Sequence, residues 1–165
     1  DPVQAKEILE EIPGSIKKVG IFVNEEYQQV IDCAVDLELD FVQFHGNETP
    51  EFCNQFGRPW FKAFRLKEEG DLEKIKAFNS EWVLVDSYVE KTFGGTGVLS
   101  NWDLAKKAGS QKALFLSGGL KPDNVLEAIK FVKPYAVDVA SGVESSPGAK
   151  DYYKMEEFIK KAQSF

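Results

Sequence analysis

The chain has 165 residues, of which 43% are hydrophobic and 28% charged, a composition typical of one globular domain with an apolar core. No apolar run approaches the roughly 20 residues that cross a bilayer, and residues 1–13 lack the basic start and apolar middle of a signal peptide. The net charge is −7 and the lysines are scattered, which excludes a basic face. We therefore expect a cytoplasmic protein with a small ligand and neither a nucleic-acid nor a membrane partner.

A helical pattern opens the chain over residues 1–12, with Asp1 as cap and Pro2 in the first turn. Six β-branched and aromatic runs follow and predict six strands, with further helical patterns between and after them. Alternating strands and helices predict a parallel sheet whose strands are covered by helices. The runs begin at Val19, Phe41, Phe61, Trp82, Ala113 and Ala136.

Three of the helices are predicted from apolar residues that recur at i, i+3, i+4 and i+7. Two further helix starts are predicted, one at Thr49 followed by Pro50 and one with Pro122 in its first turn. The apolar faces comprise Tyr27, Val30, Ile31, Ala34 and Val35; then Val125, Ala128, Ile129 and Val132; and last Met155, Phe158, Ile159 and Ala162.

Doubly wound sheets and (β/α)8 barrels share this alternation. A doubly wound sheet would concentrate its site at one switch point, whereas here polar or glycine residues end nearly every strand, which favours an α/β (β/α)8 TIM barrel with its chemistry at the C-terminal rim. Only six of the eight strands are present, so we expect residues 1–165 to be a single barrel domain, N-terminally incomplete, preceded by a β-α-β segment. The strand-end residues are Asn24, Gln43, His45, Arg65, Asp86, Ser117, Gly118, Gly119, Ser141 and Gly142.

Asp86 ends the apolar run "WVLVD". Partial desolvation there would raise its pKa toward a value useful in a proton donor; the alternative is a cap for the next loop. That loop, "SYVEKTFGGTG", contains Gly95 and either closes over a ligand or has no role, and its place at the rim favours a lid.

The segment "SGGLKPDN" is either a plain tight turn or a phosphate site. Gly118 and Gly119 let the backbone approach a ligand, and a helix that follows would direct its first amides outward. Ser141 and Gly142 supply a second small-residue turn after the next strand. Loops after the last two strands are the usual phosphate site of a barrel, so we predict phosphate binding here.

His45 is the only histidine, and Gln43 shares its strand face because alternate side chains point the same way. The sequence leaves open whether His45 is a structural donor or a substrate contact. We expect Asp138 to be buried and to support the neighbouring loops. Cys33 and Cys53 lie in helical patterns without metal-type spacing, so they are interpreted as free thiols without chemistry.

The segments "VGIFVN", "FVQFHG", "VLVDS" with "GGTG", "SGGLKPDNV" and "VDVASGVESSPGAKD" together resemble the phosphoribosylanthranilate isomerase family of tryptophan biosynthesis, over essentially the whole chain. The resemblance implies an Amadori rearrangement in a single-domain barrel without metal or organic cofactor. It implies Asp86 as the acid, and His45, Gln43 and Gly95 as substrate contacts. The substrate phosphate is expected near the amides of Gly118, Gly119, Ser141 and Gly142.

Two features of that family are not found in this sequence. The family's base is a cysteine in a Lys-Ile-Cys-Gly-Ile motif on the first strand, and an arginine after the second strand holds the anthranilate carboxylate. We therefore expect residues 1–165 alone to be inactive without a complementing N-terminal segment. Homodimerisation and fusion to indole-glycerol-phosphate synthase stay open.

Two other functions remain as alternatives. The chain could be a truncated, catalytically silent barrel that binds phosphate, or a fragment that pairs or swaps with another chain through its open strand edges. A histidine-pathway sugar isomerase would need paired aspartates in two similar halves, which the sequence lacks.

Overall fold

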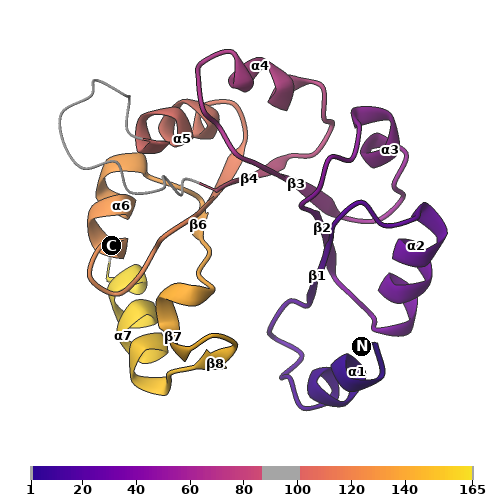
Figure 1. The fold of residues 1–165 in the computed structure, drawn as a ribbon, viewed down its shortest axis with the longest axis horizontal. Coiled ribbons are helices and arrows are strands. Elements are labelled where there is room, and N and C mark those ends of the chain that lie inside the picture. The colour runs from indigo at the N-terminus through magenta and orange to yellow at the C-terminus, as the bar shows by residue number, and fades with distance from the viewer. Residues whose placement is uncertain (1, 87–100, 165) are drawn as a thin grey trace. The chain divides into compact units, whose positions relative to one another are not determined.

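The computed structural model describes residues 2–86 and 101–164, and Figure 1 labels their elements. The helices are α1 (Pro2–Glu10), α2 (Tyr27–Asp36), α3 (Pro50–Asn54), α4 (Asp71–Lys76), α5 (Asn101–Gly109), α6 (Val125–Val132), α7 (Tyr152–Gln163) and the 3-10 helix η1 (Ser141–Val143). The strands are β1 (Val19–Phe22), β2 (Phe41–Phe44), β3 (Trp60–Phe64), β4 (Trp82–Asp86), β5 (Ala113–Ser117), β6 (Ala136–Val137), β7 (Glu144–Ser146) and β8 (Ala149–Lys150).

The chain divides into two compact units. The first comprises residues 1–63 and 77–80, and the second comprises residues 64–76 and 81–165. Strands β1, β2 and β3 pair in parallel and in chain order in the first unit, and β4, β5 and β6 do so in the second. All six predicted strands therefore form, and the parallel α/β arrangement is confirmed.

Helices α2 and α3 lie on the same side of β1 and β2 in the first unit (Figure 1). Val30 and Ala34 of α2 are fully buried, as the helical spacing predicted, whereas Val35 at the edge of that face is 54% exposed. Helix α3 begins as predicted: Thr49 Oγ1 accepts a hydrogen bond from the Phe52 amide at 3.3 Å, and Pro50 occupies the first turn.

Aromatic rings hold β2 against α3. Phe44 is fully buried, and its ring meets those of Phe52 and Phe56 edge-on, with centroid distances of 5.7 and 5.4 Å. The centroid of the Trp60 ring, from β3, lies 5.9 Å from the centroid of the Phe44 ring. Edge-to-face pairs add about 0.5–1.5 kcal/mol each beyond the area they bury. This cluster fixes the end of β2, from which His45 continues.

The core of the second unit lies between β4, β5 and the helices α4, α5, α6 and α7. The four residues predicted for the apolar face of α6 are all buried. On α7, Phe158 is buried and Met155 and Ala162 pack against the core, whereas Ile159 is 51% exposed, so the predicted face of α7 is only partly correct. The fully buried residues of this core include Ile75, Val85, Ala105, Ala108, Leu116, Val125 and Ala128.

Two local predictions in this unit were wrong. Strand β6 ends at Val137, so Asp138 lies beyond it and is exposed rather than buried. Pro122 lies in a turn and α6 begins only at Val125. The cause is the Asn124 side chain, whose Oδ1 accepts from the Lys121 amide at 2.8 Å and whose Nδ2 donates to the Gly119 carbonyl at 3.0 Å.

A hairpin of β7 and β8 follows η1 and was not predicted. The signal for it is the Pro-Gly pair at residues 147–148, because that dipeptide is typical of turns and Gly148 has a φ of 82°. The eight-stranded barrel, in contrast, stays a prediction, since the parallel strands of the described residues are the six named above. No helix in the described part of the chain is long and apolar enough to span a membrane.

Candidate active site

Asp86 is the last residue of β4. Val83 and Val85 of this strand are buried, and the Asp86 side chain is 16% exposed at the point where the strand leaves the core. The Arg65 Nε lies 3.5 Å from Asp86 Oδ2, and the Arg65 side chain is 78% exposed. The arginine was anticipated only as a polar strand end. The structure thus places the long, exposed side chain of Arg65 beside the largely buried carboxylate of Asp86.

The residues after β5 adopt a backbone that favours glycine. Gly118 has a φ of 89° and Gly119 a φ of 65°, both in the left-handed region. The sequence predicted that a helix follows these glycines directly. In the structure a turn at residues 121–124 comes between them and α6. The double glycine therefore bends the main chain at the end of β5, immediately after Ser117, the register partner of Asp86.

Gly142 brings the loop after β6 against the loop after β5. A Cβ atom at Gly142 would lie 1.8 Å from the Leu120 carbonyl oxygen and 2.9 Å from its carbonyl carbon, so only glycine fits. Ser141 and Gly142 belong to η1, a short extra helix after the last parallel strand. Loops after two successive strands together with a short extra helix are the usual construction of a phosphate site in a barrel.

Two further contacts hold these loops. Ser117 Oγ donates to Asp138 Oδ2 at 2.8 Å, which gives Asp138 the supporting contact expected of it although the residue is exposed. Lys150 Nζ donates to the Ala140 carbonyl at 2.9 Å and to Glu144 Oε1 at 2.7 Å. The Lys150 ammonium lowers the pKa of Glu144, so this carboxylate is ionised at neutral pH.

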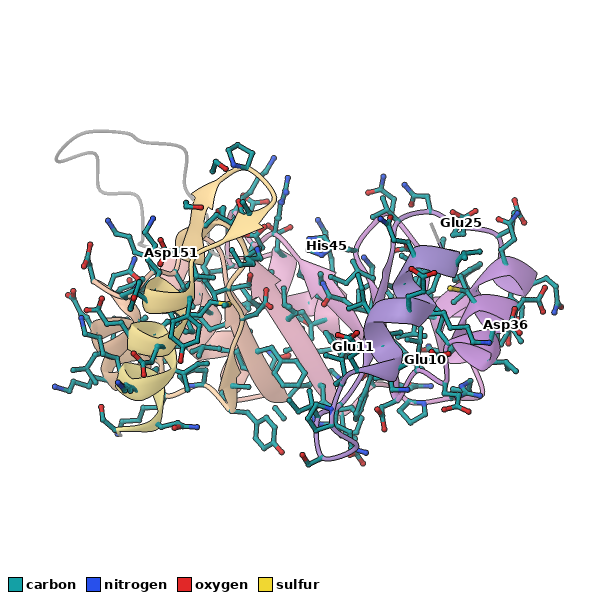
Figure 2. All side chains as sticks on the ribbon, turned by 90° about the horizontal axis from the view of Figure 1, so that it is seen from below. Glu10, Glu11, Glu25, Asp36, His45 and Asp151 are labelled. Atoms are coloured by element: carbon teal, nitrogen blue, oxygen red, sulfur yellow. The ribbon has the colours of Figure 1, made fainter. Side chains whose placement is uncertain are left out.

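His45 and Gln43 belong to the first unit. Gln43 Nε2 lies 2.7 Å from His45 Nδ1, so the structure brings the two side chains together. With the amide as donor, Nδ1 accepts, and a neutral imidazole then carries its proton on Nε2. In Figure 2, His45 and Glu25 are drawn in the upper part of this unit, whereas Asp36, the last residue of α2, is drawn lower down.

A buried ion pair near His45 escaped the sequence analysis. Lys62 Nζ lies 3.2 Å from Glu48 Oε2, and the two side chains are only 6% and 3% exposed. The available signal was a lysine within the apolar run of residues 60–64, because a charged residue inside a covered strand needs a partner.

The two cysteines are poorly suited to proton transfer. Burial raises the pKa of Cys53 to about 12, and burial together with Asp36 raises the pKa of Cys33. Both therefore stay protonated at neutral pH. Gly95 and the predicted lid lie outside the described residues. No group of three His, Cys, Asp or Glu side chains in residues 2–86 and 101–164 is arranged to hold a metal ion.

The chain matches one protein family along nearly its whole length. The family, described as N-(5'phosphoribosyl)anthranilate (PRA) isomerase, matches residues 1–161. The N-(5'-phosphoribosyl)anthranilate isomerase of Geobacter sulfurreducens is 47% identical over 164 residues, which are 99% of this chain and 81% of that protein. The enzyme of the same name from Geobacter metallireducens is 44% identical, over 99% of this chain and 81% of that protein.

Solved structures agree with the sequence match. The crystal structure of phosphoribosyl anthranilate isomerase from Thermotoga maritima has a TM-score of 0.86 and 37% identity, and the match covers 100% of this chain and 82% of that one. A crystal structure of the enzyme in complex with reduced 1-(o-carboxyphenylamino)-1-deoxyribulose 5-phosphate has a TM-score of 0.85 and 36% identity, with 100% and 80% covered. This chain therefore belongs to the phosphoribosylanthranilate isomerase family.

Proposed function

We propose that the protein is a phosphoribosylanthranilate isomerase of tryptophan biosynthesis, which converts N-(5-phosphoribosyl)anthranilate into 1-(o-carboxyphenylamino)-1-deoxyribulose 5-phosphate. The family match over residues 1–161 supports the reaction. The structural observation that best supports this function is the close approach of Gly142 to the Leu120 backbone. This approach joins two small-residue loops beside β4, the strand that ends in Asp86.

The amides near Gly118, Gly119, Ser141 and Gly142 hold the substrate phosphate in this proposal. Main-chain N–H groups at bent loops and at the start of a short helix bind anions without a cationic side chain. This matters in a chain of net charge −7, whose overall field repels a phosphate. His45 and Gln43 contact the substrate in this proposal, as does Gly95, which lies outside the described residues.

Asp86 is the general acid in this proposal. It donates a proton to the ribose ring oxygen, which opens the ring and leaves an iminium group; loss of the C2′ proton to a base then gives the enolamine, which tautomerises to the ketone. Arg65 Nε lies 3.5 Å from one oxygen of this carboxyl group. An Asp or Glu in such a role contributes about 10²–10⁴-fold to the rate.

The base is not assigned to residues 1–165. The Lys-Ile-Cys-Gly-Ile motif is not among them, and both thiols have raised pKa values. We propose that residues 1–165 alone bind the substrate phosphate but turn over slowly or not at all. Turnover by this chain that equals turnover by the whole gene product would refute the requirement for a further segment.

The acid role is tested with Asp86→Asn in the whole gene product. We expect kcat to fall by about 10²–10⁴-fold while substrate binding changes little, because Asn keeps the size of Asp but has no carboxyl proton to donate. Asp32→Asn is the matched control, since Asp32 is exposed on α2, where it accepts a hydrogen bond from Gln28. Near-normal kcat in Asp86→Asn would exclude Asp86 as the acid.

The catalytically silent fragment is not favoured as an alternative. The relatives of this chain are named as the isomerase, and the chain covers about four-fifths of their length. A solved relative from Thermotoga maritima is described as dimeric, and sedimentation analysis tests whether this protein also forms a homodimer.

A further inference from the structure

The buried ion pair of Glu48 and Lys62 connects the middle of β3 to the ends of β1 and β2 in the first unit. Lys62 of β3 is the register partner of Phe44 of β2, so the two side chains point to the same face of the sheet. Lys62 Nζ donates to the Gly46 carbonyl at 2.7 Å, the Ala63 carbonyl at 3.2 Å and the Phe44 carbonyl at 3.4 Å. The lysine therefore holds the main chain on both sides of His45.

Glu48 binds backbone amides, as Lys62 binds backbone carbonyls. Its Oε1 accepts from the Asn24 amide at 2.8 Å, and its Oε2 accepts from the Gly46 amide at 2.9 Å. Burial by itself would raise the pKa of Glu48, but hydrogen bonds from the backbone amides of Asn24 and of Glu48 itself, together with Lys62, lower it below its ordinary value. The carboxylate is thus ionised at neutral pH and ties the loop after β1 to the loop after β2.

These contacts fix each peptide group next to His45. The His45 amide donates to the Phe22 carbonyl at 2.8 Å, the Gly46 amide is held by Glu48, and the Gly46 carbonyl by Lys62. Glycine is required at position 46, because a Cβ there would lie 2.7 Å from the Asn24 backbone nitrogen. Within the described residues, Gln43 orients the His45 ring through the contact at 2.7 Å, and the main chain that carries the ring has little freedom to move.

A buried ion pair is weak evidence for a role in stability, because a well-packed apolar pair of similar volume is often equally or more stabilising. Directional bonds to fixed carbonyl and amide groups, in contrast, specify one backbone conformation. The Glu48–Lys62 pair supplies six such bonds to backbone groups of Asn24, Phe44, Gly46 and Ala63. Apolar side chains would not replace them.

We propose that Glu48 and Lys62 are positioning residues, which hold the His45 imidazole in the orientation needed to contact the substrate. The inference rests on the proposed function and deepens it, since it assigns a role to two residues that do not themselves contact the substrate. Their effect on turnover acts through His45.

The test is a double-mutant cycle between Glu48→Gln and His45→Gln in the whole gene product. Gln keeps the volume of Glu and leaves Lys62 its three carbonyl partners, but it removes the negative charge beside Lys62 and replaces one carboxylate oxygen, an acceptor, with an amide NH2 donor. We expect Glu48→Gln to lower kcat/KM by about 10- to 100-fold, since small misplacements of a substrate-contacting group cost that much. In the His45→Gln background the same change should cost less than 3-fold. Equal losses in both backgrounds would overturn the proposal.

A second measurement does not depend on activity. His45 is the only histidine of residues 1–165, and comparison with His45→Gln assigns its imidazole NMR signals. We expect Glu48→Gln and Lys62→Met to shift these signals and to speed hydrogen exchange of the Gly46 amide by at least 10-fold, with unchanged signals in Glu73→Gln, which alters an exposed ion pair with Lys76. Unchanged His45 signals in a folded Glu48→Gln protein would refute the positioning role.

The two measurements separate the inference from the proposed function. Absence of turnover in the wild-type gene product would refute the isomerase, whereas the NMR comparison would still decide whether the ion pair fixes His45. Thermal unfolding of each variant establishes that it is folded at the assay temperature, and Glu48→Gln serves where Lys62→Met fails to fold.

Discussion

Substitution of Gly142 by alanine tests the contact between the two phosphate loops. Gly142 lies outside the left-handed region, so alanine is not excluded by its backbone conformation; the obstacle is the space. The added Cβ would lie 1.8 Å from the Leu120 carbonyl oxygen, whereas real Cβ atoms approach no closer than 3.0 Å. The difference, 3.0 − 1.8 = 1.2 Å, is the least distance by which the loops must separate.

A displacement of this size acts on ligand binding more than on the fold. Overpacking costs about 1–3 kcal/mol of stability, and a shift of about 1 Å in a binding group costs on the order of 100-fold in reactivity. We expect Gly142→Ala to raise the KM for phosphoribosylanthranilate by about 10- to 100-fold and to weaken competitive inhibition by inorganic phosphate by a similar factor. The change in kcat should be smaller, since Asp86 belongs to β4 and not to either loop.

Steady-state kinetics with and without inorganic phosphate measure both effects, and urea unfolding measures the loss of stability. Gly57→Ala is the matched control, because a Cβ at Gly57 would meet nothing within 4 Å. A folded Gly142→Ala protein with unchanged KM and unchanged inhibition by phosphate would show that these loops do not hold the phosphate.

Two predictions concern stability. Asp71→Asn should lower the free energy of unfolding at pH 7. Hydrogen bonds from Lys74 and from the amides of Lys67 and Glu68 lower the pKa of Asp71 from 3.8 to about 2. The stability that the ionised Asp71 contributes is therefore fully present above pH 3.8 and is lost as the pH falls through about 2. Urea unfolding should therefore show a much larger difference between variant and wild type at pH 7 than at pH 2, and an equal difference at both would contradict the assignment. Leu116→Ala should cost about 2–5 kcal/mol because Leu116 is fully buried, against less than about 0.5 kcal/mol for the exposed Ile159→Ala; similar losses in the two would refute the core described for the second unit.

The elements of this fold could be predicted because each depends on a local pattern. The spacing of Val125, Ala128, Ile129 and Val132 identified the buried face of α6, since a period of 3.6 residues is a property of the helix itself. The six strand starts followed from apolar runs in the same way. The start of α6 was misplaced because the Asn124 side chain competes for the backbone groups of the preceding turn.

The candidate site was only partly predictable. Asp86 and the glycine loops could be named because strand ends converge on one edge in any parallel sheet. The Glu48–Lys62 pair was missed because it depends on residues 14 positions apart that meet where β3 passes the ends of β1 and β2, which no local pattern encodes. Asp138 was taken as buried because the strand was assumed to continue, whereas β6 ends at Val137.

The most direct test of the phosphate site is a titration of the 15N-labelled whole gene product with inorganic phosphate, followed by the backbone amide signals. We predict that the largest shifts occur at the amides of Gly118, Gly119, Ser141 and Gly142, with saturation at a common dissociation constant and smaller shifts in Gly142→Ala. Phosphate binding that saturates while these four amides remain unshifted would contradict the account.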